Sequence, residues 1–145
     1  MTERHPRGVL DTSAVISLPQ ITDPSTLPAE PVITTVTLAE LSVGPLVATD
    51  ERERAARQAH LQQAEADFTP LAFDAAAARA FGRVALSLRQ AGRKPAARSY
   101  DAMIAATALA NDLPIYTANP DDFREIDGLE VVAVIPRAPQ SAPHP

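Results

Sequence analysis

Acidic residues stand at the ends of several short apolar runs in this chain. Asp11 closes the run "RGVLD", Glu40 lies in the first turn of the helix expected after "VITT", and Asp101 opens the helix-like segment before "LPIYT". Carboxylates gathered at one place raise each other's pKa unless a cation lies between them. Oxygen ligands without histidine or cysteine nearby suit Mg²⁺ or Mn²⁺. Such an ion activates water and neutralises charge on a phosphate, so the chemistry indicated is phosphodiester hydrolysis.

Each acidic position also has a purely structural interpretation. Asp11 could cap a helix that begins near Thr12, and Thr37-x-x-Glu40 fits a capping box. Asp101 could favour the positive end of a helix dipole. A polar turn follows LPIYT, with Asn119, Asp121 and Asp122. Structural roles explain each position alone, whereas three or four carboxyl groups at one edge of one sheet favour a cation site.

The elements that must position these residues alternate along the chain. Strand-like segments cover residues 7–11, 32–35, 68–73, 113–117 and 129–135, and helix-like segments cover 12–18, 37–48, 50–66, 74–92 and 100–112. This alternation predicts an α/β fold in three α/β/α layers, with a central parallel sheet of four to five strands. Ligands bind at the carboxyl ends of the strands in such sheets, where the acidic residues are expected.

Length and composition indicate one small domain. The 145 residues suffice for a single core, and we expect a domain over residues 1–136 and a Pro-rich, disordered tail over 137–145. The sequence has no cysteine, which excludes disulfides and thiolate metal sites. It shows neither a signal peptide nor an apolar run of about 20 residues, so we expect a cytoplasmic protein without membrane contact.

The charge of the chain is unevenly distributed. Residues 75–100 contain six cations and no acid, and because the whole chain carries −5, the rest carries −11. The cations are Arg79, Arg83, Arg89, Arg93, Lys94 and Arg98. A solvated helix face explains such a stretch as well as a phosphate-binding face does. The negative total argues mildly against a generic nucleic-acid binder.

Four ordered segments resemble the motifs of PIN-domain ribonucleases. "VLDTSAVISL" is similar to the opening motif of that family, and "VTLAELSVG" resembles its second motif, T-x-x-E-L-x-x-G. "YDAMIAATALANDLPIYTANPDDF" resembles the third and fourth motifs. The matches run from Val9 to Phe123, and the nearest group is the VapC toxins of bacterial VapBC toxin–antitoxin pairs.

The resemblance implies a metal-dependent endoribonuclease. Asp11, Glu40 and Asp101 would ligate Mg²⁺, with Mn²⁺ as a substitute, and Thr12 or Ser13 would orient them. Asn119 would complete the catalytic set where many members carry a fourth aspartate, although it brings no charge for a second ion. Asp122 is the alternative fourth ligand.

The family also implies partners. It commonly forms homodimers, it cleaves tRNA or structured ribosomal RNA, and a cognate VapB-like antitoxin blocks its site. In this setting the basic stretch would hold RNA backbone, because phosphate contacts give affinity without sequence information. The residues assigned to that role are Arg89, Arg93 and Arg98.

Two other readings of the sequence stay open. A catalytically impaired PIN-like scaffold would explain Asn119. An aspartyl-phosphate phosphatase or receiver domain would also place an aspartate after its first strand. The phosphatases require D-x-D, but position 13 is serine, and the only lysine, Lys94, lies in the basic segment instead of near a late strand.

Overall fold

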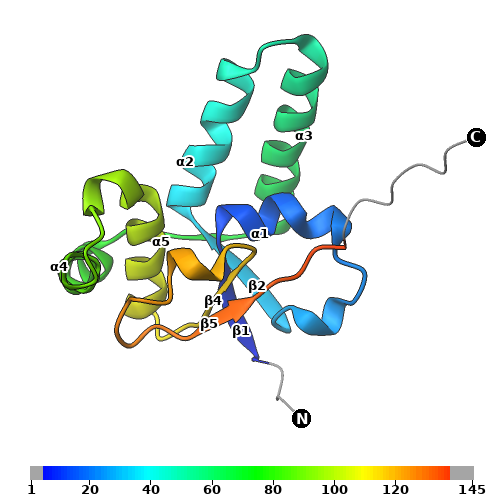
Figure 1. The fold of residues 1–145 in the computed structure, drawn as a ribbon. Helices are drawn as coiled ribbons and strands as arrows, with labels where there is room; N and C mark the ends of the chain where they lie inside the picture. Colours follow the sequence, from blue (N-terminus) through cyan, green and yellow to red (C-terminus); the bar gives the residue numbers. More distant parts are fainter. Residues whose placement is uncertain (1–4, 138–145) are drawn as a thin grey trace, which may run out of the picture.

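A five-stranded parallel sheet forms the centre of the molecule (Figure 1). The computed structural model describes residues 5–137. The strands are β1 (Arg7–Leu10), β2 (Glu30–Thr34), β3 (Pro70–Leu71), β4 (Ile115–Thr117) and β5 (Val131–Ala133). Their order in the sheet is β3-β2-β1-β4-β5, and every neighbouring pair is parallel. The predicted sheet is therefore confirmed, with β1 at its centre.

Within residues 5–137, five helices connect the strands. They are α1 (Thr12–Ser17), α2 (Thr35–Val43), α3 (Glu51–Asp67), α4 (Ala75–Gln90) and α5 (Ser99–Ala110). Short 3₁₀ turns lie between the helices and strands: η1 (Leu18–Gln20), η2 (Pro24–Thr26), η3 (Gly44–Val47), η4 (Pro95–Arg98) and η5 (Pro120–Asp122). Within residues 5–137, no helix combines the length and the hydrophobicity that crossing a bilayer takes.

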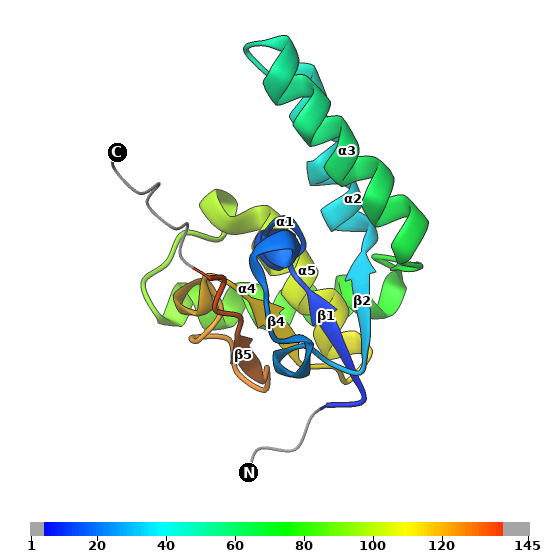
Figure 2. The ribbon, with the colours of Figure 1, turned by 90° about the vertical axis from the view of Figure 1, so that its right-hand side faces the viewer.

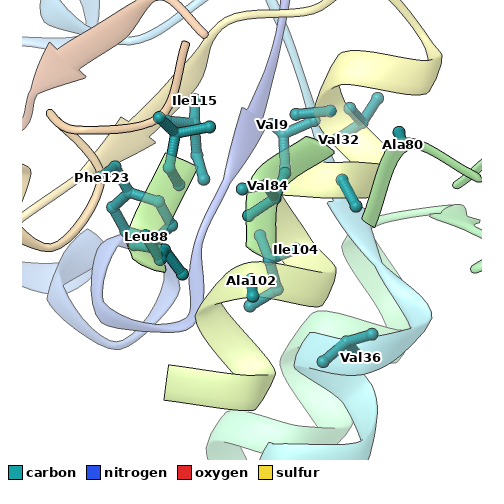
Figure 3. Packing of buried hydrophobic residues seen from close by; sticks show 14 residues of the cluster. Val9, Val32, Val36, Ala80, Val84, Leu88, Ala102, Ile104, Ile115 and Phe123 are labelled. Carbon is teal, nitrogen blue, oxygen red and sulfur yellow. The ribbon is translucent and has the colours of Figure 1, made fainter. Parts of the chain in front are cut away.

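Both faces of the sheet are buried, because successive side chains of a strand point to opposite sides. Val9, Val32 and Ile115 pack with α4 and α5, as Figure 3 shows. Leu10, Ile33 and Tyr116 pack on the other face with residues of α1 and α3. The sheet thus lies between two helical layers, which confirms the three-layer α/β/α prediction.

The small residues of α5 allow this helix to pack closely against α4 in the core that both share with the sheet. Ala102, Ala105, Ala106 and Ala108 are fully buried. A helix surface of methyl groups can lie against a sheet without large side chains between them. This packing fixes α5, and the residues of its first turn are held at the carboxyl edge of β1 and β4.

Helices α2 and α3 rise together away from the sheet (Figures 1 and 2). The helix expected over residues 37–48 is interrupted at Gly44-Pro45, since α2 ends at Val43 and η3 follows. Arg57 of α3 donates from Nη1 to the Gly44 carbonyl at 2.9 Å, which ties the two helices near the bend.

The predicted tail falls mostly outside the described residues. Arg137 is its first residue, and its N–H donates to the Gln20 carbonyl at 2.9 Å. Residues 138–145 lie outside the described range, so the disorder expected there stays a prediction.

Candidate active site

Asp11 lies at the carboxyl end of β1 and is 3% exposed. Its Oδ1 accepts hydrogen bonds from the Ala14 N–H and the Ser13 hydroxyl, each at 2.8 Å. Its Oδ2 accepts one from the Thr117 hydroxyl at 2.6 Å. Burial raises the pKa of Asp11, and these hydrogen bonds oppose the rise. Asp11 does cap α1, as its structural interpretation required, but a carboxylate offers about four lone-pair sites and these three donors leave one free.

Glu40 extends from α2 toward α1. The Thr12 hydroxyl donates to its Oε1 at 2.7 Å, and the same hydroxyl lies 3.2 Å from the Thr37 hydroxyl. Burial raises the pKa of Glu40, the bond from Thr12 opposes the rise, and repulsion from Asp11 adds to it. Glu40 and Asp11 are therefore close enough to sense each other's charge.

The sequence-based interpretation of Glu40 as half of a capping box is wrong. Helix α2 begins at Thr35, directly after β2, and Thr34 caps it by accepting the Thr37 N–H at 3.2 Å. Glu40 consequently lies in the second turn of α2 instead of the first. The carboxylate is left to project toward Thr12 and the sheet edge.

Asp101 is the third residue of α5, which begins at Ser99, one residue earlier than predicted. Burial, followed by repulsion from Asp122, Asp11 and Glu40, raises the pKa of Asp101 to about 6, while Arg98 opposes the rise. Repulsion of this kind requires the carboxyl groups to share one neighbourhood. The three predicted acidic residues therefore lie in one region of the structure, and Glu40 and Asp101 line the same cavity.

The polar turn after β4 contributes Asp122 more directly than Asn119. Asn119 is exposed, and its backbone N–H donates to the Thr117 hydroxyl at 3.0 Å. Asp122 is half-buried and pairs with Arg98, with 2.6 Å between Oδ1 and Nη1. Because its charge also raises the pKa of Asp101 and Asp11, Asp122 belongs to the acidic cluster, which we define as Asp11, Glu40, Asp101 and Asp122.

Thr117 supports this cluster in a way that the sequence patterns did not reveal. Its hydroxyl bonds Asp11 and accepts the Asn119 N–H, and it lies 3.3 Å from the Ser13 hydroxyl. The sequence feature that could have revealed this role is a threonine at the end of a buried strand, two positions before Asn119 in the polar turn. A buried hydroxyl there needs a partner, and the adjacent parallel strand supplies Asp11.

The three arginines assigned to RNA lie in different surroundings. Arg98 borders the acidic cluster through its pair with Asp122. Arg93 donates two hydrogen bonds to Glu125, from Nε at 2.8 Å and from Nη2 at 3.2 Å. Arg89 is exposed in the last turn of α4, and no ion pair joins it to another residue of the described range 5–137.

The basic stretch does not form one continuous face. Arg79 and Arg83 line a cavity with Leu109 and Ala110, at the carboxyl end of α5, whereas Arg98 stands at its start. A helix of twelve residues is about 18 Å long. The cations of residues 75–100 therefore reach both ends of α5. Among the ion pairs of the described residues, Arg98 is the cation that pairs with a member of the acidic cluster.

The donor set is suited to a hard cation. Within residues 5–137, no three acidic or histidine side chains already stand close enough to enclose an ion. Mg²⁺ does not require such a cage, since it commonly keeps several waters and takes one or two carboxylates with substrate phosphate oxygens. The acidic cluster supplies four carboxyl groups at one edge, and Thr12, Ser13 and Thr117 orient two of them.

A cavity of about 490 Å³ opens beside the acidic cluster. Its lining residues are Glu40, Ala96, Arg98, Ser99, Tyr100 and Asp101. A second cavity, about 390 Å³ and mainly apolar, lies between α1 and α3 and contains His60. Carboxylates line the first cavity, which makes it the candidate active site.

Comparison with known proteins gives the class to which this site belongs. The family model described as PIN domain matches residues 9–129, and the chain belongs to the PIN-domain family. This membership decides against the aspartyl-phosphate alternative. Its relatives are VapC proteins: the chain is 40% identical over 130 residues to Ribonuclease VapC5 of Mycobacterium tuberculosis, covering 88% of this chain and 93% of the relative.

Two further comparisons agree. Ribonuclease VapC1 of Rickettsia felis is 28% identical over 129 residues, which cover 87% of this chain and 95% of the relative. The crystal structure of VapBC-5, a toxin–antitoxin system from Mycobacterium tuberculosis, matches with a TM-score of 0.73 and 39% identity, covering 92% of this chain and 99% of that one. The resemblance to the VapC group stated from the sequence is confirmed.

Proposed function

We propose that this chain is a Mg²⁺-dependent endoribonuclease and the toxic component of a type II toxin–antitoxin pair. The observation that carries the proposal is the acidic cluster, four carboxyl groups whose repulsion contributes to raising the pKa of Asp101 to about 6 at the carboxyl edge of the sheet. A relative that is 40% identical is named a ribonuclease. Burial of repelling carboxyl groups costs stability, which favours a functional reason for their convergence.

Asp11, Glu40 and Asp101 would hold the ion, which lowers the pKa of water and offsets the charge of the phosphate when bound. Thr117 and Ser13 keep the Asp11 carboxylate directed at the sheet edge. Glu40, held by Thr12 and half-buried, takes the proton of the attacking water. The water oxygen bonds to phosphorus as the bond to the 3′ oxygen breaks. The leaving 3′ oxygen takes a proton from solvent, which gives a 3′-hydroxyl and a 5′-phosphate.

The partners follow from the same relatives. Solved neighbours are titled as VapBC complexes, including one from Rickettsia felis bound to a DNA fragment from their promoter. We infer a VapB-like antitoxin, a homodimer that forms a larger complex with it, and a cytoplasmic location. The substrate class is tRNA or structured ribosomal RNA, and Arg89, Arg93 and Arg98 would hold its backbone.

RNA cleavage with defined ends tests the proposal. Purified protein is incubated with total RNA and Mg²⁺, Mn²⁺ or EDTA, and new ends are mapped by sequencing. We expect metal-dependent cuts with 5′-phosphates, reduced by about 10²-fold or more in Asp101→Asn, since several kcal/mol of transition-state stabilisation depend on the ion. Asp112→Asn, the same change at an exposed position after α5, should cut normally.

Two results would contradict parts of this scheme. RNA binding without cleavage by the unchanged protein would favour the catalytically impaired scaffold. Ends carrying 2′,3′-cyclic phosphate would show that the 2′-hydroxyl, instead of water, attacks the phosphorus.

A further inference from the structure

Tyr100 combines exposure and position in a way that packing does not explain. The chain has two tyrosines and four phenylalanines, and Tyr100 is the exposed one, at 53%. The described ring–ring contacts join other residues, Phe73 to Phe81 and His5 to Tyr116. Within residues 5–137, the Tyr100 ring thus has no aromatic neighbour, and it contributes nothing to either core cluster.

The ring borders the same cavity as the acidic cluster. Tyr100 directly precedes Asp101 in the first turn of α5, and both line the cavity with Glu40. The lining therefore offers carboxylates for a metal-bound phosphate, the Arg98 guanidinium and one flat apolar surface. A nucleotide has matching parts, a phosphate and a flat base. The cavity, about 490 Å³, falls within the range of about 300–1,000 Å³ usual for ligand sites.

We propose that Tyr100 binds the base next to the scissile phosphate by stacking. The inference rests on the proposed nuclease function and adds to it a residue that binds the substrate. Aromatic side chains bind splayed bases of single-stranded loops through their faces, and every base has such a face. A base inside a duplex is already stacked on both sides and cannot reach the ring without being extruded.

A double-mutant cycle tests the stacking contact. The probe is a synthetic RNA that spans a cut site mapped in total RNA, made with the normal base or with an abasic nucleotide beside the scissile phosphate. We expect Tyr100→Ala and the abasic change each to lower kcat/KM by about 5- to 150-fold, the range of one stacked base. Together they should cost little more than either alone, because both remove the same contact.

Conservative and matched variants separate stacking from loss of structure. Tyr100→Phe keeps the ring, so its KM and its cleavage rate should match those of the unchanged protein. Leu86→Ala removes a side chain of similar exposure, 55%, that does not line the cavity, and should have no effect. A complementary strand annealed across the cut should abolish cleavage by the unchanged protein.

The outcomes distinguish this inference from the function beneath it. No metal-dependent cleavage by the unchanged protein contradicts the nuclease proposal itself. Cleavage by Tyr100→Ala at the normal rate, or fully additive effects in the cycle, overturns the role of Tyr100 and leaves the nuclease intact. Normal RNA cleavage by Tyr100→Ala with weakened antitoxin inhibition would assign the ring to the protein partner instead.

Discussion

The Thr117 hydroxyl donates to Oδ2 of Asp11 at 2.6 Å and thereby joins the carboxyl ends of β4 and β1. The two residues are 106 positions apart in the chain. Both are buried, at 0% and 3% exposure. The same hydrogen bond therefore holds the Asp11 carboxylate in the candidate site and links the paired strands β1 and β4.

Replacing this hydroxyl tests its contribution to stability. Thr117→Val keeps the side-chain shape, and we expect it to lower the free energy of unfolding by about 1.5–3 kcal/mol, the value of a hydrogen bond to a charged group. Thr107→Val is the matched control, because Thr107 is also buried but donates to the Met103 carbonyl. It should cost only about 0.5–1.5 kcal/mol in urea unfolding. Equal losses would show that the Asp11 hydrogen bond is not special.

The raised pKa of Asp101 predicts a pH-dependent stability difference. The folded pKa of about 6 lies above the ordinary value of 3.8, so the folded state binds the proton more tightly and Asp101 destabilises the fold increasingly as pH rises from about 4 through 6. Asp101→Asn should therefore be more stable than the unchanged protein at pH 7 in EDTA. We expect about 1 kcal/mol, since solvent screens this half-exposed group.

The measurement is urea unfolding of both proteins at several pH values. The advantage of Asp101→Asn should shrink as pH falls through 6 and disappear below about 4, where Asp101 is protonated in both states. An advantage that stays constant with pH would mean that repulsion at Asp101 is not its cause.

Metal binding should stabilise the fold without any substrate present. A ligand that binds only the folded state adds about 2.7 kcal/mol at 100 times its Kd. We expect Mg²⁺ to raise the melting temperature of the unchanged protein and of Asp112→Asn, and to leave Asp101→Asn nearly unchanged. If the three proteins respond alike, the ion binds elsewhere.

We expect Asp122 and Asn119 to contribute differently to metal binding at the fourth ligand position. Asp122 belongs to the acidic cluster, whereas Asn119 is exposed and uncharged. Asp122→Asn should weaken Mn²⁺ binding by about 10-fold or more in calorimetric titration, the scale of losing a supporting ligand. Asn119→Ala and the exposed control Asp121→Asn should change it little. A larger effect of Asn119→Ala would reverse the assignment.

Neutralising the assigned arginines should change the salt dependence of RNA binding. Removal of one cation that neutralises a phosphate flattens the logarithmic salt slope by about 0.7 for single-stranded RNA. We expect the flattening for glutamine variants of Arg89, Arg93 and Arg98. Arg79→Gln with Arg83→Gln is the control at the far end of α5 and should leave the slope unchanged. The reverse pattern would place the RNA along the other end of α4.

Local sequence patterns predicted the strands and the positions of Asp11 and Asp101. Asp11 follows a short buried strand, and parallel strands end at one edge, so its place followed from the alternation of elements alone. The start of α2 was predicted two residues late, because β2 passes into α2 without a loop and the threonines of "VITTVT" suit a strand, a cap and a helix equally.

Long-range pairs could not be predicted in the same way. The ion pair of Arg98 with Asp122 joins residues 24 positions apart, and Arg93 meets Glu125 across 32. The charge count groups these arginines in one basic stretch. In the structure, Arg93 lies after α4 and Arg98 ends η4, so their side chains have different neighbours. Which cation meets which acid depends on packing that no local pattern contains.

The central position of β1 in the sheet has a consequence for the timing of synthesis. Asp11 leaves the ribosome first, yet β4, which pairs with β1 and carries Thr117, emerges only after more than 100 further residues. A nascent chain that has not reached Ile115 cannot assemble the edge on which the carboxylates converge. If the proposed function holds, a nascent chain that still lacks the fourth strand would have no complete active site, and an antitoxin would be needed only once that strand has been added.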